Sequence, residues 1–181
     1  MKRVLVAGIG NIFLGDDGFG CEVARRLASQ AMPDGVDVVD FGIRGMDLKY
    51  ALEDAYELVI LVDTVERGGA PGTLYVIEPS LEAAVPERPP SPHGMDPATV
   101  LGFVAGLHGA APRVLLIACE PDWLGGEEGH MGLSDAVTPS VDEVVDEVLA
   151  LLRDAAASGR GERPAMQPRM TVEGAGRLRE E

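Results

Sequence analysis

The chain has 181 residues, 46% of them hydrophobic, and its 15 basic and 30 acidic side chains give a formal net charge of −15. This length and composition suit one domain with a hydrophobic core. The negative charge argues against a nucleic acid partner, because phosphate neutralisation needs a face of Lys and Arg. No stretch is long and apolar enough to span a membrane. Cys21 and Cys119 lie far apart in apolar segments, as expected for reduced thiols in a cytosolic protein.

The N-terminal segment begins with an apolar run at residues 4–7, continues through a glycine-rich turn, Gly8-x-Gly10, and then carries Asp16 and Asp17. The run predicts a buried parallel strand. A glycine-rich turn between a strand and a helix usually binds phosphate through backbone N–H groups. Here Phe13 replaces the third glycine of the dinucleotide fingerprint. The two carboxylates would repel a pyrophosphate and suit a cation better.

Strand and helix patterns alternate along the rest of the body. Residues 18–31 have helical spacing, and Ser140-x-x-Glu143 is a capping-box pattern that predicts the start of the last helix. The segment 86–92 holds four prolines and is expected to be an extended loop. Further strands are expected at 36–40, 58–63, 74–77 and 114–119, and further helices at 45–54 and 96–107.

This alternation predicts an α/β fold, an open, twisted, mostly parallel five-stranded sheet with helices on both faces. The strand at 74–77 follows a glycine-rich turn and is expected to run antiparallel at an edge. We expect a single domain over residues 1–153. Beyond Arg153 the chain is rich in Gly, Pro, Arg and Ala with almost no apolar periodicity, so residues 154–181 are predicted to be a disordered tail.

Two aspartates are expected to meet at one edge of this sheet. Open α/β sheets bind ligands at the carboxyl ends of strands, where the strand order reverses. If the order begins with the second, first and third strands, Asp17 and Asp63 face each other across that crevice. Either residue alone is explained as well by a helix cap or a strand end. Together with His93, which lies in a polar loop, they form a reasonable ligand set for a divalent metal.

Two further residues leave alternatives open. Asp40 ends the second strand, where a Rossmann fold keeps its ribose-binding acid, and this favours a nucleotide-binding protein. The incomplete glycine fingerprint weighs against that interpretation. Trp123, the only tryptophan, is expected either to contact a ligand or to anchor the long loop 121–137.

Several short segments occur in a fixed order between residues 3 and 152. They are Gly8-x-Gly10-Asn11 with Asp16-Asp17, Asp40-x-Gly42-x-x-Gly45, Val62-Asp63, Pro71-Gly72, Ser91-Pro92-His93-Gly94, Glu120-Pro121 and Leu133-Ser134. Together they resemble the hydrogenase maturation endopeptidases, which trim a C-terminal extension from the large subunit of nickel-iron hydrogenases after nickel insertion. Phe41 and Ile43 depart from the glycine and threonine that are usual in the second of these motifs.

The resemblance implies a cytoplasmic endopeptidase whose partner is the hydrogenase large-subunit precursor. It implies that Asp17, Asp63 and His93 contact the nickel carried by that precursor, with other divalent metals able to replace it, and Asp40 is a further catalytic candidate. Water would attack the peptide carbonyl, driven by metal polarisation or by a carboxylate base. The sequence has no H-E-x-x-H motif. Two alternatives remain: a non-enzymatic nickel-sensing chaperone and a Rossmann-like nucleotide-binding module.

Overall fold

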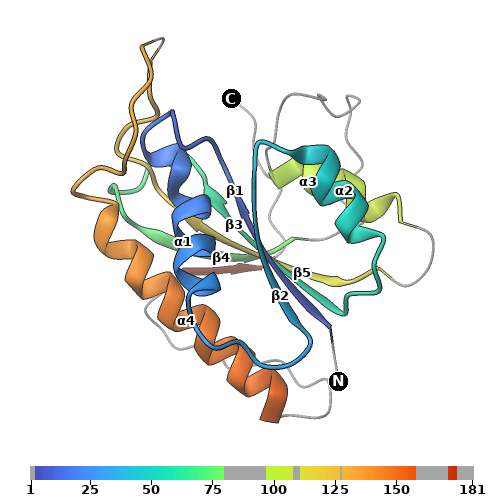
Figure 1. Ribbon diagram of the computed structural model, residues 1–181. Helices are drawn as coiled ribbons and strands as arrows, with labels where there is room; N and C mark the ends of the chain where they lie inside the picture. The colour runs from blue at the N-terminus through green and yellow to red at the C-terminus, as the bar shows by residue number, and fades with distance from the viewer. Residues whose placement is uncertain (1–2, 80–96, 108–110, 127, 158–170, 175–181) are drawn as a thin grey trace.

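The computed structural model describes residues 3–79, 97–107, 111–126, 128–157 and 171–174. Helices cover both faces of a single mixed sheet (Figure 1). The strands are β1 (Val4–Ile9), β2 (Val36–Gly42), β3 (Leu58–Thr64), β4 (Leu74–Glu78), β5 (Arg113–Cys119) and β6 (Thr171–Gly174), and the helices are the 3-10 turn η1 (Asp16–Gly18), α1 (Phe19–Ala28), α2 (Gly45–Leu52), α3 (Pro97–Ala105) and α4 (Thr138–Ala157).

The strand order is β2-β1-β3-β5-β4-β6. All five predicted strands are present, and β2, β1, β3 and β5 run parallel to one another. β4 pairs antiparallel with β5 as expected. The order reverses between β1 and β3, so the carboxyl ends of these two strands form the crevice at which such sheets bind ligands.

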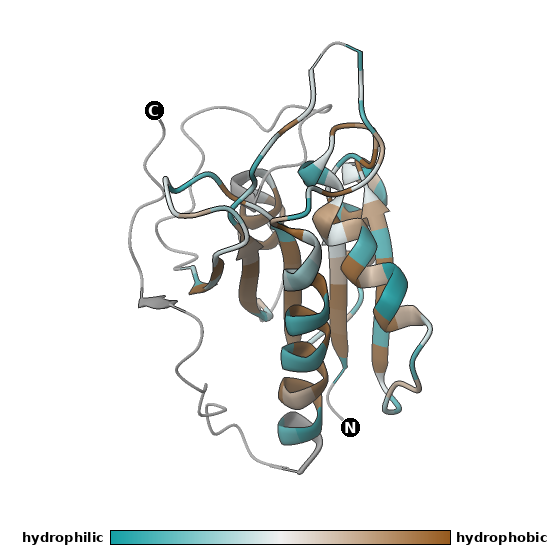
Figure 2. Ribbon diagram, turned by 90° about the vertical axis from the view of Figure 1, so that its left-hand side faces the viewer, coloured by the Kyte–Doolittle hydropathy of each residue, from teal (hydrophilic) through white to brown (hydrophobic). Residues whose placement is uncertain are grey.

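Two hydrophobic cores fill the layers above and below the sheet. α1 and α4 pack on one face, where their apolar side chains meet those of β1, β3, β4 and β5. α2 and α3 pack on the other face, against the alternate residues of the same strands. In Figure 2 polar residues lie outward along α4, and the strands behind it are mostly apolar. Burial on both faces explains why β1, β3 and β5 are continuous apolar runs.

α1 approaches the sheet at van der Waals distance through two glycines. A Cβ atom on Gly20 would lie 2.1 Å from the carbonyl oxygen of Val62 and 2.3 Å from that of Ile9. On the strand side, a Cβ on Gly8 would lie 2.2 Å from the carbonyl oxygen of Gly20. This contact fixes the N-terminal end of α1, and with it η1, directly over the ends of β1 and β3.

The capping-box prediction for the last helix was wrong. α4 begins at Thr138, upstream of Ser140, whose hydroxyl donates to the carbonyl of Gly72 at 2.8 Å. The capping role belongs to Ser134 instead. Its hydroxyl accepts the N–H of Val137 at 3.3 Å, and its carbonyl accepts the N–H of Thr138 at 3.0 Å.

The tail differs in part from its prediction. α4 continues past Arg153 to Ala157, and residues 171–174 form β6, which pairs parallel with the outer side of β4. The sheet therefore has a sixth strand that the composition of the tail does not indicate. The other residues of the tail lie outside the described part of the chain, as does the proline-rich segment. Among the described helices, none has both the length and the apolarity to cross a membrane.

Candidate active site

Asp17 lies in η1, immediately above the ends of β1 and β3. One of its carboxylate oxygens accepts the backbone N–H of Asn11 at 2.8 Å. The other accepts the hydroxyl of Thr64 at 3.5 Å. The side chain is half-buried, so a carboxylate held from both sides still reaches solvent.

Asp63 is the last residue but one of β3, at the same crevice, and is only 4% exposed. Its Oδ1 accepts the N–H of Thr64 at 2.8 Å. Thr64 therefore touches both acids, with its amide on Asp63 and its hydroxyl on Asp17. The structure brings together the two aspartates that the expected strand order placed at this edge.

His93, the third predicted ligand, lies outside the described residues. Within the described ranges, no group of three or more His, Cys, Asp or Glu side chains could hold a metal ion. The metal-ligand set of Asp17, Asp63 and His93 therefore remains a prediction.

Asp40 is exposed on β2 and faces Cys21 of α1. Burial raises the pKa of the Cys21 thiol, and the nearby carboxylate of Asp40 raises it further. The charges of Asp17 and Asp63 act in the same direction. All three candidate acids therefore contribute to one negative field around this thiol. A thiol held protonated in this way is a poor nucleophile.

Backbone N–H groups of the glycine-rich turn already donate hydrogen bonds within the protein. The N–H of Gly10 donates to the carbonyl of Gly42 at 3.2 Å, and that of Leu14 to the carbonyl of Asn11 at 3.0 Å. The N–H of Asn11 binds Asp17 at 2.8 Å, and that of Phe13 binds the side chain of Asn11 at 3.0 Å. A phosphate at this turn would have to displace these bonds and approach Asp17, which argues against the nucleotide-binding alternative.

Asp16 has a different role from that of its neighbour. It is fully buried, and its carboxylate accepts the N–H groups of Asp122 at 2.9 Å and Trp123 at 3.0 Å. It also accepts the N–H of Ser134 at 2.7 Å and its hydroxyl at 2.9 Å. This carboxylate fixes both ends of the loop between β5 and α4. The sequence offered only a weak signal for it, since a helix cap accounts well for one of two adjacent acids.

Glu120 is a further buried acid, with 4% exposure, and the sequence marked it only as part of the Glu120-Pro121 segment. It accepts the N–H groups of Arg67 at 3.0 Å and Gly68 at 2.9 Å. The hydroxyl of Tyr75 donates to it at 2.8 Å. Glu120 therefore shapes the loop that follows β3, next to Asp63.

Trp123 anchors the loop, and a contact with a ligand remains a prediction. Its backbone N–H donates to Asp16, and the residue is 45% exposed. The ring meets that of His130 edge to face, with centroids 5.1 Å apart. The loop therefore presents an exposed aromatic side chain from a fixed backbone.

The fold is that of the open α/β domains that bind their ligands at the switch point of the sheet, and here carboxylates lie at that point. The sequence profile of the hydrogenase maturation protease family matches residues 21–151. The hydrogenase expression/formation protein HupD of Rhodobacter capsulatus is 36% identical over 155 residues, covering 84% of this chain and 72% of HupD.

Two solved structures extend this similarity to the fold. The hydrogenase maturating endopeptidase HybD from Escherichia coli superimposes with a TM-score of 0.70 and 29% identity, covering 85% of this chain and 94% of HybD. The hydrogenase 2 maturation peptidase of a Thaumarchaeota archaeon has a TM-score of 0.63 and 37% identity, covering 84% and 99%. The chain belongs to the hydrogenase maturation protease family and is a peptidase.

Proposed function

We propose that this chain is a cytoplasmic endopeptidase that removes the C-terminal extension from the large-subunit precursor of a nickel-iron hydrogenase after nickel insertion. Family membership and the names of its relatives as maturation proteases support this function. The observation that carries the proposal is the position of Asp17 and Asp63 on either side of Thr64, at the switch point of the sheet.

In this proposal the nickel belongs to the substrate. Asp17 and Asp63 offer carboxylate oxygens, and His93 supplies the imidazole that suits a late divalent metal. The half-buried Asp17 leaves the site open to a second macromolecule. The enzyme thereby recognises the precursor by the metal that it carries, and other divalent metals can occupy the same ligands.

The reaction is hydrolysis of one peptide bond. Water adds to the carbonyl carbon, the C–N bond breaks, and the leaving nitrogen takes a proton. The substrate's metal supplies electrophilic polarisation when present. Asp17, Asp63 and Asp40 are the candidate carboxylates of the site, and one of them can accept the proton of the attacking water. The protonated thiol of Cys21 takes no covalent part.

The test is incubation of the purified chain with nickel-loaded precursor and mass spectrometry of the precursor. We expect the loss of one C-terminal fragment. Asp17→Asn and Asp63→Asn should abolish this loss, whereas Asp146→Asn, on the exposed face of α4, should cleave normally. An unchanged precursor mass with the wild-type chain would contradict the proposal.

A further inference from the structure

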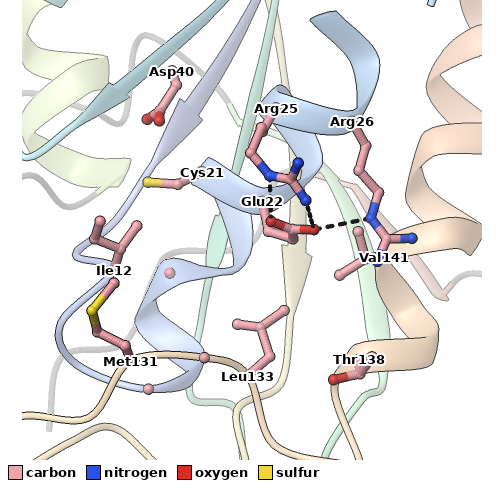
Figure 3. A pocket seen from close by; sticks show the side chains of 13 residues that line it. Ile12, Cys21, Glu22, Arg25, Arg26, Asp40, Met131, Leu133, Thr138 and Val141 are labelled. Carbon is pink, nitrogen blue, oxygen red and sulfur yellow. Dashed lines mark hydrogen bonds and ion pairs between the residues drawn. The ribbon is translucent and has the colours of Figure 1, made fainter. Parts of the chain in front are cut away.

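A groove of about 450 Å³ opens beside the candidate active site, between α1 and the segment that leads into α4. Its volume falls in the range of ligand-binding clefts, roughly 300–1,000 Å³. Ile12 and Met131 lie at one end and Thr138 and Val141 at the other (Figure 3). The groove is therefore built by two chain segments that the Asp16 carboxylate holds together.

The walls of the groove are largely apolar. Ile12 is 43% exposed and Met131 is 65% exposed, although both are large hydrophobic side chains. Leu133 and Val141 also line the groove. Exposed apolar side chains that gather on one surface mark a site for an apolar partner.

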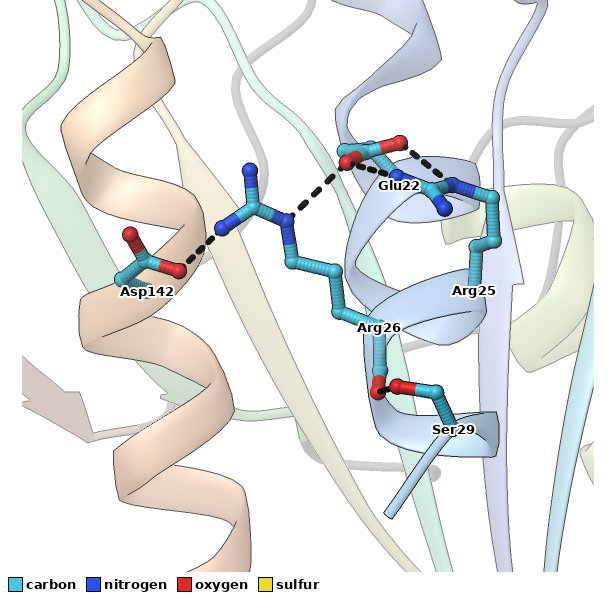
Figure 4. Close-up of polar contacts among 5 residues, drawn as sticks. All are labelled: Glu22, Arg25, Arg26, Ser29 and Asp142. Atoms are coloured by element: carbon cyan, nitrogen blue, oxygen red, sulfur yellow. Dashed lines mark hydrogen bonds and ion pairs between the residues drawn. The ribbon is translucent and has the colours of Figure 1, made fainter.

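The two arginines at the rim are already neutralised. Arg25 binds Glu22 through two hydrogen bonds, at 2.9 and 2.6 Å. Arg26 binds the same carboxylate at 3.0 Å and also pairs with Asp142 of α4 (Figure 4). The hydrogen bond from Arg25 is the main reason that the pKa of Glu22 lies below its ordinary value. These paired cations therefore offer little attraction to an anion.

The groove adjoins the candidate site through Cys21 and Asp40, which both line it. The thiol of Cys21 donates to the carbonyl of Gly10 at 3.4 Å, and the N–H of the next residue, Asn11, donates to Asp17 at 2.8 Å. A chain that passes the active site can therefore place its neighbouring side chains in the groove. The carboxylate of Asp40 disfavours acidic side chains beside it.

We infer that this groove is a subsite for an uncharged apolar side chain of the precursor, close to the bond that is cut. The inference rests on the proposed function and adds which side chain of the precursor the peptidase accepts near the cut. An acidic side chain at that position of the precursor is rejected, because the occupant meets an apolar wall and the carboxylate of Asp40.

The test compares Met131→Asp with Met46→Asp in cleavage of nickel-loaded precursor. Met46 is also an exposed methionine, at 48%, but it lies on α2 and outside the groove. Met131→Asp should raise KM by about tenfold or more with little change in kcat, because an apolar contact to the substrate is lost. Met46→Asp should match the wild type, and thermal melts should show that both variants fold.

A substrate series completes the experiment. Apolar residues on either side of the cut are replaced by Asp one at a time, and one replacement should slow the wild-type enzyme by about tenfold or more. Met131→Lys should reduce that penalty. Equal KM values for Met131→Asp and Met46→Asp would overturn the subsite. A wild-type chain that leaves the parent precursor intact would instead overturn the proposed function.

Discussion

The carboxylate of Asp16 accepts both the backbone N–H and the hydroxyl of Ser134, a residue 118 positions away in the sequence. Through this contact, one buried side chain joins the start of α1 to the cap of α4. The same carboxylate holds Trp123, so a single acid sets the course of the loop that lines the groove.

Replacing Asp16 should therefore destabilise the protein. Asp16→Asn puts an amide donor among groups that are all donors, which should lower the free energy of unfolding by about 3 kcal/mol. Denaturant titration measures the change. Asp122→Asn is the control, because only the backbone of Asp122 enters this network and its side chain is exposed. Equal stabilities for the two variants would show that the network contributes little.

Gly20 should resist replacement by alanine. In a helix this change ordinarily stabilises by about 1 kcal/mol. Here the new Cβ would lie 2.1 Å from a backbone oxygen of β3, so we expect a net loss of about 2 kcal/mol or more. Gly126→Ala, where a Cβ meets nothing within 4 Å, should leave the melting temperature unchanged. A stabilised Gly20→Ala would mean that α1 can move away from the sheet.

The two thiols should be inert in the folded protein. Burial raises the pKa of Cys119 from 9.0 to about 12 and also raises that of Cys21. At a pH where the thiols of the unfolded chain ionise, those of the folded protein stay protonated. The contribution of the buried thiols to the free energy of unfolding is therefore complete below about pH 9. It is lost as the pH rises through the pKa values of the folded state. Iodoacetamide at pH 8 should label neither thiol without denaturant and should leave cleavage intact. Inactivation by rapid labelling would point to a thiol mechanism.

His93→Ala should fold normally and fail to process precursor. The residue lies in a polar segment of the sequence, so its removal should change stability by less than about 0.5 kcal/mol. Thermal melts and the cleavage assay are run on the same preparations, with His108→Ala as the matched histidine control. Full cleavage by His93→Ala would remove this residue from the site.

Cleavage should depend on nickel in the precursor more than on nickel in the buffer. Two carboxylates and one imidazole are few ligands for the free enzyme, and soft ligands from the substrate would add most of the affinity for a late divalent metal. Chelator-treated enzyme is given apo or nickel-loaded precursor, and the cleaved fractions are compared. Equal cleavage of the apo and nickel-loaded precursors would remove nickel recognition from the mechanism and favour an acid-base peptidase without a metal requirement.

Local patterns predicted the parts of the fold that depend on local burial. β1 and β3 are apolar on both faces, and Asp17 and Asp63 follow from where these strands end. The contacts of Asp16 and Glu120 join residues distant in sequence, so no nearby spacing marks them. Ser140 has the right spacing for a cap, but Ser134 starts the turn earlier and Gly72 takes the Ser140 hydroxyl. β6 pairs through its backbone, which composition does not encode.

Trp123 gives this chain a built-in optical reporter. It is the single tryptophan, so all indole emission comes from one point, where the residue is 45% exposed and its ring meets that of His130 edge to face. Its backbone N–H is held by Asp16, whereas its exposed surface can be covered by a binding partner. Emission from this residue can therefore follow the arrival of another protein at this side of the sheet in real time, without a label and before any bond is cut.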